Sequence, residues 1–227
     1  MRQAPIAPNC DRAVSRFVAP EGFRRLPGRI GAAGQKELIG MVLAGVAASP
    51  LYQPAMPRTG KPLSVRMTNF GPLGWVTDKE KGYRYEPAHP VTGDPWPAMP
   101  QMLLDLWAAE TGWPGPPEAC LVNWYAPGAR MGLHVDNDEN AADAPVLSIS
   151  LGDKARFRLG GPERKDPTAS FVLSSGDVVV LGGQARQCHH GVDRIYPGTS
   201  QALPQAWRPG RINLTLRRVN AIKVADI

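Results

Sequence analysis

Cysteine is scarce in this chain, with three residues among 227. Cys10, Cys120 and Cys188 are odd in number, lie far apart and form no CxxC pair, which excludes a disulfide framework. Because structural disulfides belong to oxidising compartments, this usage favours a reducing one, and we expect a cytoplasmic protein.

The chain also lacks a long hydrophobic run. The longest, around residues 41–48, is far short of the roughly 20 residues that a membrane-spanning helix needs. The first residues include arginines but no continuous apolar segment, so a secretory signal is not expected. Hydrophobic residues still make up 43% of the chain, enough for a full core, and we expect a monomeric protein without a membrane partner.

Acidic residues are few in the first part of the chain. Residues 1–66 contain 10 Lys and Arg against 3 Asp and Glu, while the remainder is close to neutral. A basic surface beside a near-neutral body suits a polyanionic partner. Charge alone is equally compatible with a role in solubility.

Glycine and proline are abundant, at 24 each, and indicate many turns rather than a helical bundle. Apolar residues at helical spacing predict helices over 35–49 and 99–112, with a Pro- and Gly-rich segment at 50–100. From residue 120 the hydrophobic period changes to two, which predicts short strands at 120–125, 132–136, 146–151, 155–159, 170–173, 177–181, 188–192 and 212–218. Helices ahead of many short antiparallel strands predict a double-sheet β-roll with helices packed outside.

The stretch LHVDND (133–138) contains a candidate metal site. Alternate residues of a strand share a face, so His134, Asp136 and Asp138 point the same way. The first two can therefore bind one metal ion from a single strand.

Histidine is scarce too, and His89 and the adjacent pair His189 and His190 are the only others. Since neighbouring strand residues face opposite ways, only one of that pair can join His134 and Asp136. Two imidazoles and a carboxylate on one side of an ion leave open positions opposite, as in non-haem Fe(II) oxygenases. Mn²⁺ and Co²⁺ fit the same ligands, and an isolated HxD is more often structural.

The stretch RINLTLR (211–217) places Arg211 and Arg217 on one polar face, opposite an apolar one. If that face is buried the arginines need an anionic partner, whereas on an edge strand it would simply be solvated. Arginine grips a carboxylate with two parallel hydrogen bonds. The histidines and arginines together therefore suggest a metal centre with a clamp for a dicarboxylate co-substrate.

These motifs resemble the AlkB family of Fe(II)/2-oxoglutarate-dependent dioxygenases, which dealkylate nucleobases oxidatively. The resemblance spans roughly residues 60–218 and is carried by SVRMTNFGPLGW (64–75), GYRYEP (82–87), PWPAMPQ (95–101), ACLVNWYAPGARMGLHVDNDE (119–139), GDVVVLGG (176–183), HHG (189–191) and RINLTLR (211–217). It implies a mainly β (α+β) fold with a double-stranded β-helix, or jelly-roll, catalytic core at 119–218. An N-terminal arm at 1–34, helices with a nucleotide-recognition lid at 35–118, and a tail at 219–227 would complete the chain.

The resemblance implies three cofactors or co-substrates, Fe(II), 2-oxoglutarate and O₂. It selects His190 as the third iron ligand beside His134 and Asp136, because the family's ligand directly precedes the glycine. It also implies that 2-oxoglutarate contacts Asn123, Tyr125, Arg211, Asn213 and Arg217. In that pattern Arg211 pairs with the distal carboxylate, and Arg217 lies near the 1-carboxylate and the iron.

On the substrate side, the resemblance implies that Trp75 and Tyr83 flank a flipped alkylated base, that Met67 forms a pocket wall, and that Asp138 contacts the base. A base must leave its stack before an oxidant can reach its alkyl group. Taken singly, the two aromatic residues are as well explained by packing of a loop onto the core.

The expected activity is dealkylation of bases such as 1-methyladenine and 3-methylcytosine in DNA or RNA, with release of aldehyde, succinate and CO₂. Two alternatives are an oxygenase that acts on a protein or small molecule, and a metal-free module that binds nucleic acid. Trp124, Leu181 and His189 depart from the family pattern, which affects the expected lesion range and strand preference.

Overall fold

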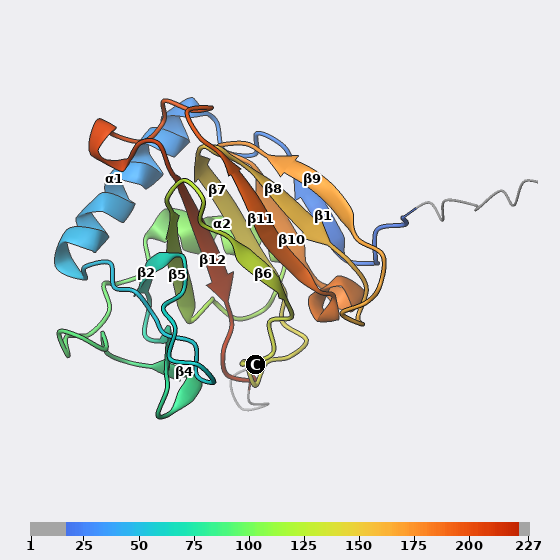
Figure 1. Ribbon diagram of the computed structural model, residues 1–227, viewed down its shortest axis with the longest axis horizontal. Helices are drawn as coiled ribbons and strands as arrows, with labels where there is room; N and C mark the ends of the chain where they lie inside the picture. Colours follow the sequence, from blue (N-terminus) through green and yellow to red (C-terminus); the bar gives the residue numbers. More distant parts are fainter. Residues whose placement is uncertain (1–16, 223–227) are drawn as a thin grey trace, which may run out of the picture.

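Residues 17–222 are described by a computed structural model, and they form two facing antiparallel β-sheets with two α-helices outside (Figure 1). Residues 1–16 of the expected N-terminal arm, including Cys10, and residues 223–227 of the expected tail lie outside the described part. The two described cysteines, Cys120 and Cys188, are buried and free.

The larger sheet has the strand order β1-β10-β7-β12-β5-β2. Its strands are β1 (Phe23–Leu26), β2 (Arg66–Phe70), β5 (Ala119–Tyr125), β7 (Val146–Gly152), β10 (Val178–Leu181) and β12 (Arg211–Arg217). Strand β12 lies in the middle, paired along its whole length with both β5 and β7. The polar face of β12 is therefore not the solvated face of an edge strand.

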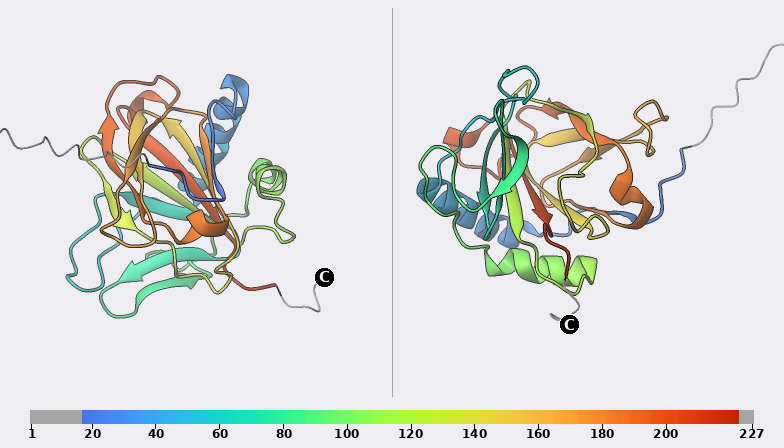
Figure 2. Two further views of the ribbon diagram at one scale, coloured as in Figure 1. Left: turned by 90° about the vertical axis from the view of Figure 1, so that its right-hand side faces the viewer. Right: turned by 90° about the horizontal axis from the view of Figure 1, so that it is seen from below.

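The smaller sheet has the order β6-β11-β8-β9. It consists of β6 (Met131–His134), β8 (Lys154–Leu159), β9 (Ala169–Leu173) and β11 (His190–Tyr196). A separate hairpin of β3 (Gly74–Asp78) and β4 (Gly82–Glu86) covers one end of the sheets, and we call residues 74–86 the lid hairpin (Figures 1 and 2).

The helices α1 (Ala32–Ala48) and α2 (Gln101–Thr111) lie on the outer face of the larger sheet (Figure 2). Helix α1 ends at Ser49 because Pro50 cannot continue it, and α2 ends at Gly112, which adopts a left-handed conformation with φ 61°. Both helices bear an apolar stripe, and side chains such as Leu38 and Trp107 pack against the sheet. Neither helix is long and apolar enough to cross a membrane in the described part of the chain.

Strand alternation divides the interior into two layers. On β12, Ile212, Leu214 and Leu216 face the helices and form one core with alternate residues of β5, β7 and β10. The opposite face of the larger sheet looks toward the smaller sheet, where a second apolar core includes Phe157 and Val179. The polar face of β12 thus points into the space between the two sheets.

The fold confirms the expected jelly-roll and all eight strands predicted after residue 119, with ends that differ by at most four residues. The strand expected at 132–136 ends at His134, so Asp136 lies beyond it. The predicted helices at 35–49 and 99–112 correspond to α1 and α2. Strands β1 to β4 were not predicted, because they are short and lie in segments dense in Pro, Gly and charged residues. Two of them, β1 and β2, form the edges of the larger sheet.

Candidate active site

A cavity of about 680 Å³ opens between the sheets and the lid hairpin. All the site residues expected from the sequence line it: Met67, Trp75, Tyr83, Asn123, Tyr125, His134, Asp136, Asp138, His190, Arg211, Asn213 and Arg217. They come from both sheets, from the lid hairpin and from the segment that follows β6, so only the folded chain brings them together.

Three of these residues form a cluster suited to a metal ion. Ligand atoms of His134, Asp136 and His190 all lie within 4.8 Å of one another. Both histidine Nε2 atoms lie 3.5 Å from the Asp136 carboxylate. The Nδ1 atom of His134 is 2.8 Å from the carbonyl of Gly132, and that of His190 is 3.1 Å from the carbonyl of Cys188, which directs each Nε2 toward the shared centre.

Strand pairing explains how the two histidines meet. In the antiparallel pair β6–β11, His190 stands directly opposite His134, and the ring centroids are 4.6 Å apart. The neighbouring His189 makes backbone hydrogen bonds with Gly160 and Gly161 instead. Of the two adjacent histidines, the structure therefore brings His190 to the cluster.

The electrostatics of the cluster favour an ionised carboxylate. Burial by itself would raise the pKa of Asp136, but the charges of Arg217 and His190 outweigh it and hold the pKa well below its usual range. The Oδ2 atom of Asp136 is buried and accepts no hydrogen bond from the residues in the range 17–222. A buried carboxylate oxygen without a donor fits a metal ligand, so the residues present suit Fe(II).

Arg211 is a buried cation with donors that are free to bind an anion. Its side chain is 1% exposed, and its Nη2 donates to the Ser150 hydroxyl at 3.0 Å, while Nε and Nη1 have no partner in the described structure. The guanidinium lies over the ring of Tyr125, 5.3 Å from the centroid. Burial lowers the pKa of Arg211, and no carboxylate of the described residues pairs with it. A dicarboxylate co-substrate would supply the missing partner.

The two asparagines face each other across β5 and β12, where Asn123 is the register partner of Asn213. The Asn213 amide donates to Ser148 at 2.7 Å and to the Ile149 carbonyl at 3.0 Å, and its oxygen accepts from Thr215. Asn213 is thus held rigidly at the cavity wall. Asn123 and Tyr125 lie beside it with their side chains buried.

Arg217 connects the metal cluster to residues that the sequence did not single out. It donates to Asp136 Oδ1 at 2.6 Å and to Glu139 Oε1 at 2.8 Å. The carboxylate of Glu139 also accepts from Arg186 and from the hydroxyl of Tyr85. The sequence did not predict the buried network of Glu139, Arg186 and Tyr85. None of these residues shows a spacing or a repeat that would indicate a functional role.

The lid hairpin supplies the aromatic wall. Trp75 and Tyr83 stack on each other with centroids 5.5 Å apart, and Trp75 Nε1 donates to Asp138 at 2.8 Å. Met67 is 1% exposed, whereas Tyr83 is 50% exposed. The two rings leave no space for a base between them as they stand, so a base flanked by both requires the rings to separate.

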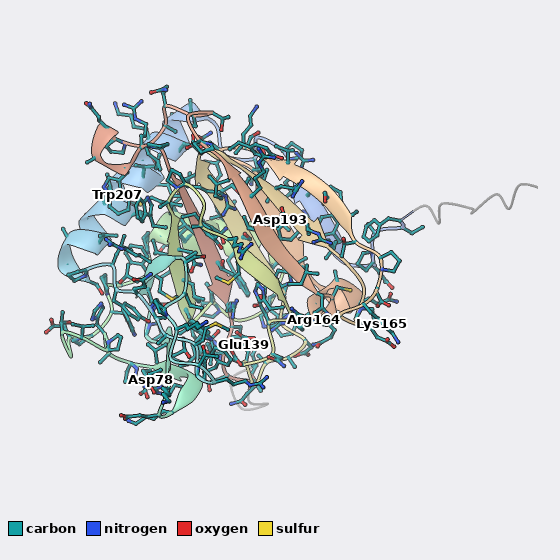
Figure 3. The ribbon with its side chains drawn as sticks, viewed as in Figure 1. Asp78, Glu139, Arg164, Lys165, Asp193 and Trp207 are labelled. Atoms are coloured by element: carbon teal, nitrogen blue, oxygen red, sulfur yellow. The ribbon has the colours of Figure 1, made fainter. Side chains whose placement is uncertain are left out.

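Three further basic side chains, Lys61, Arg130 and Arg164, line the cavity. Arg164 lies on the loop between β8 and β9 (Figure 3), and its Nη1 donates to the Leu133 carbonyl at 2.8 Å. The sequence had not identified Arg130 or Arg164 as site residues. Of the positions that depart from the family pattern, Leu181 lines the cavity, while Trp124 packs against Trp207 away from it.

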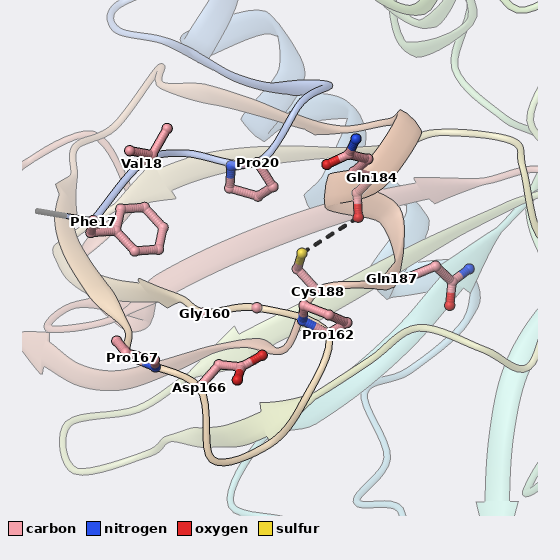
Figure 4. Close-up of a pocket in the computed structure, with 11 residues that line it drawn as sticks. Phe17, Val18, Pro20, Gly160, Pro162, Asp166, Pro167, Gln184, Gln187 and Cys188 are labelled. Atoms are coloured by element: carbon pink, nitrogen blue, oxygen red, sulfur yellow. Dashed lines mark hydrogen bonds between the residues drawn. The ribbon is translucent and has the colours of Figure 1, made fainter. Parts of the chain in front are cut away.

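A second cavity of about 500 Å³ lies outside this site, beside residues 17–20, the loop at 160–167 and the short 3₁₀ helix η1 (Gly183–Gln187) (Figure 4). Cys188 borders it and donates its thiol to the Gln184 carbonyl at 3.4 Å. Burial raises the pKa of this thiol. The cavity shares none of the residues that line the cavity between the sheets.

A jelly-roll with two histidines, a carboxylate and a buried arginine in one cavity defines a 2-oxoglutarate- and Fe(II)-dependent oxygenase, and residues 22–217 match the 2OG-Fe(II) oxygenase superfamily. An AlkB homolog of Caulobacter vibrioides, described as an alpha-ketoglutarate-dependent dioxygenase, is 50% identical over 220 residues, which cover 96% of this chain and 97% of the relative. AlkB of Escherichia coli is 44% identical over 174 residues, covering 75% of this chain and 78% of the relative.

Among solved structures, OsALKBH1 superposes with a TM-score of 0.73 at 30% identity, covering 89% of this chain and 99% of that one. The chain belongs to the AlkB family. It is a 2-oxoglutarate-dependent dioxygenase, and its cofactors and co-substrates are Fe(II), 2-oxoglutarate and O₂.

Proposed function

We propose that this dioxygenase removes alkyl groups from the ring nitrogens of nucleobases in DNA or RNA, such as 1-methyladenine and 3-methylcytosine. One observation supports this best: a single cavity joins the His134, Asp136 and His190 cluster to an aromatic and acidic wall with basic residues around its mouth. A relative from Mus musculus, described as nucleic acid dioxygenase ALKBH1 and 34% identical over 130 residues, supports the same substrate class.

In this proposal the metal ligands are His134, Asp136 and His190. Bound Fe(II), with 2-oxoglutarate and O₂, supplies the oxidation of the alkyl carbon bound to nitrogen, with succinate and CO₂ as co-products. The hydroxylated carbon then leaves as an aldehyde and restores the base. The protein holds the reacting groups in place and excludes water from them.

The co-substrate is held by the polar face of the larger sheet. Arg211 binds the distal carboxylate, since its buried guanidinium has free donors, and Tyr125 lies beside it. Asn123 and Asn213 line the path from Arg211 toward the metal ligands. Arg217 keeps Asp136 ionised and lies close to where the 1-carboxylate would approach.

The base is received by the lid hairpin. Trp75 and Tyr83 offer stacking surfaces, which contribute about 1–3 kcal/mol per base in nucleic-acid complexes. Asp138 is held by Trp75 Nε1 at the cavity wall, where its negative charge suits a cationic lesion. Met67 lines the same cavity, and we propose that Arg130 and Arg164, which also line it, contact phosphates.

We further propose that residues 35–118 provide the helices and the lid and that residues 119–218 provide the catalytic core. A cytoplasmic location and a monomeric state remain predictions from the sequence.

The test is release of formaldehyde from a methylated single-stranded oligonucleotide with Fe(II), ascorbate and 2-oxoglutarate. We expect stoichiometric formaldehyde and succinate from the wild type and neither from Asp136→Ala. Formaldehyde release no higher than that of Asp136→Ala would refute the assignment to nucleobases. If succinate still formed without the oligonucleotide's demethylation, an oxygenase with a protein or small-molecule substrate would be favoured instead.

A further inference from the structure

The proposed metal ligand Asp136 lies on a segment that no β-sheet holds in place. Strand β6 ends at His134, and residues 135–145 form no strand before β7 begins at Val146. His134 and His190, by contrast, are at the ends of paired strands. The position of the carboxylate relative to the two imidazoles must therefore be set by side chains.

A single buried arginine holds this segment at three points. The Arg186 side chain is 3% exposed, and its Nε donates to the Ala144 carbonyl at 2.9 Å. Its Nη1 donates to the main-chain carbonyl of Asp136 itself, and its Nη2 donates to Glu139 Oε2 at 2.7 Å. One planar guanidinium thus binds the start, middle and end of the segment 136–144.

The same arginine is close in the chain to the second histidine ligand. Arg186 lies on η1, four residues before His190, and the intervening Cys188 carbonyl receives the His190 Nδ1 contact. The arginine therefore joins the segment that carries Asp136 to the segment that carries His190. These two ligands are separated by 54 residues of sequence but are fixed to each other through one side chain.

Glu139 extends the contact to Arg217. Its side chain has no solvent exposure, and its Oε1 accepts from Arg217 Nη1 while Oε2 accepts from Arg186. Arg217 Nη2 in turn donates to the Asp136 carboxylate. The result is a closed ring of contacts. Arg186 holds the main-chain carbonyl of Asp136, and Glu139 holds Arg217, whose guanidinium binds the Asp136 carboxylate. Figure 3 shows Glu139 near the lid end of the sheets.

The ring is balanced in charge. Two arginines and two carboxylates are buried together, so their formal charges cancel. Removal of one member leaves an uncompensated charge in the interior, which the remaining side chains must move to relieve. Any such movement acts on Asp136, because Asp136 is bonded to the ring through both its carbonyl and its carboxylate.

The lid hairpin is connected to the same ring. Tyr85, on β4, donates its hydroxyl to Glu139 and accepts from Arg217 Nη1 at 3.2 Å. Its ring lies on the same hairpin as Trp75 and Tyr83. Glu139, which holds Arg217, therefore also contacts the lid hairpin, the proposed base-binding element.

We propose that Arg186 and Glu139 are positioning residues of the metal site. Arg186 fixes Asp136 relative to His190, and Glu139 fixes Arg217 against the Asp136 carboxylate. Neither touches the metal or the co-substrate. This inference rests on the proposed metal ligands His134, Asp136 and His190.

The test measures metal binding by the metal-free protein, with Co²⁺ as the probe and its visible absorption as the report on coordination geometry. We expect Arg186→Met to bind Co²⁺ about 10–100-fold more weakly than the wild type, the usual effect of losing a group that orients a metal ligand. Its Co²⁺ spectrum should also change. Arg186→Lys retains the charge but cannot reach three acceptors. Its Co²⁺ affinity should therefore lie between those of the wild type and Arg186→Met.

Glu139→Gln provides a second variant that keeps the side-chain shape and removes the charge between the two arginines. We expect weaker Co²⁺ binding and a changed spectrum here too, since Arg217 loses its anchor. If Arg186→Met does not fold, Glu139→Gln and Arg186→Lys carry the test.

Two controls separate positioning from general stability. Arg156→Met removes an arginine of the outer face of β8 that pairs with Asp193 and is 41% exposed, and it should bind Co²⁺ like the wild type. Leu38→Ala removes a fully buried side chain from α1, so it should lower the melting temperature without changing the Co²⁺ affinity or spectrum.

The outcomes are distinct. Wild-type Co²⁺ affinity and spectrum in folded Arg186 and Glu139 variants would overturn the positioning role while leaving the metal site intact. An equal loss of affinity in Leu38→Ala would also overturn it, because the effect would then follow stability alone. If the wild type and His134→Ala bound Co²⁺ equally, the proposed metal ligands would be wrong and the inference would fall with them.

Discussion

Replacing Arg211 should change stability and co-substrate binding in opposite directions. The Arg211 guanidinium is 1% exposed, and within residues 17–222 only a neutral hydroxyl, that of Ser150, accepts a hydrogen bond from it. Such a charge is costly to bury, and the lowered pKa of Arg211 reflects the same burial. Arg211→Met keeps much of the volume and removes the charge. We expect the variant without ligands to unfold at the same temperature as the wild type or at a higher one.

Binding of 2-oxoglutarate should be lost in the same variant. A carboxylate about 4 Å from a guanidinium gains about 4 kcal/mol at the effective dielectric constant of about 20 that suits protein sites. Since about 1.4 kcal/mol corresponds to a factor of ten, removal of the charge should weaken 2-oxoglutarate binding by up to about a thousandfold. Two unpartnered donors, Nε and Nη1, are available for that contact in the wild type.

The assay is anaerobic calorimetry of 2-oxoglutarate binding to the Mn²⁺-loaded protein, together with thermal unfolding with and without ligands. Arg194→Met, which removes an exposed arginine of β11, is the control and should bind 2-oxoglutarate normally. A less than threefold loss of affinity in Arg211→Met would show that another group binds the distal carboxylate. A fall of several degrees in the melting temperature of the ligand-free variant would show that Arg211 is not an unsatisfied charge.

Three further predictions concern Asp138, the ion pairs of Glu110 and helix packing. Asp138→Asn should lower kcat/KM for oligonucleotides with the cationic 1-methyladenine about 2–5-fold, the worth of a partly exposed charge, and should have less effect on a neutral alkylated base; equal effects on both would argue against charge recognition. Hydrogen bonds from Arg29 and Arg24 lower the pKa of Glu110 although burial opposes them, so its contribution to stability is present above about pH 4.3, the unfolded value, and is lost as the pH falls through the lowered pKa. Urea unfolding should therefore show Glu110→Gln less stable than the wild type at pH 7 and equal to it at acid pH, and a difference that persists in acid would contradict this linkage. In α1, a Cβ at Gly45 would overlap the ring of Phe70, whereas nothing lies within 4 Å of one at Gly40. Gly45→Ala should therefore cost about 1–3 kcal/mol and Gly40→Ala should add about 0.4–1 kcal/mol, and denaturant titrations that gave the same sign for both would refute the close contact.

The hydrophobic periodicity of the sequence was sufficient to predict the strands of the catalytic core. The strands after residue 119 are apolar on at least one face and are bounded by Gly, Pro and charged residues, so their period and ends are visible in the chain. The edge strands β1 and β2 and the lid hairpin were missed, because their residues gain strand structure from partners far away rather than from their own periodicity. Arg24 and Arg25 of β1, for example, lie in a strand because β10 supplies the hydrogen bonds.

In the candidate active site, too, the sequence pattern predicted some features and only the folded structure decided others. The alternation in RINLTLR placed Arg211 and Arg217 correctly on one polar face, but it left open whether that face was solvated or buried. Pairing of β12 with β5 and β7 decided the question, because a central strand has no free edge and its polar face here looks at the second sheet.

By itself, the sequence predicted that His134 and Asp136 could bind one metal ion, that one of two adjacent histidines could complete the set, and that Arg211 and Arg217 share a strand face. These predictions are consequences of the two-residue period of a strand, which acts over neighbours only. The expected strand at 132–136 ends at His134 in the structure, so Asp136 lies beyond the sheet. The tertiary structure alone decided that His190 stands opposite His134, that Trp75 and Tyr83 stack on each other, and that Arg186 and Glu139 enclose Asp136 and Arg217. Those contacts join residues separated by 8 to 78 positions, and burial makes each charge depend on a partner that local sequence does not identify.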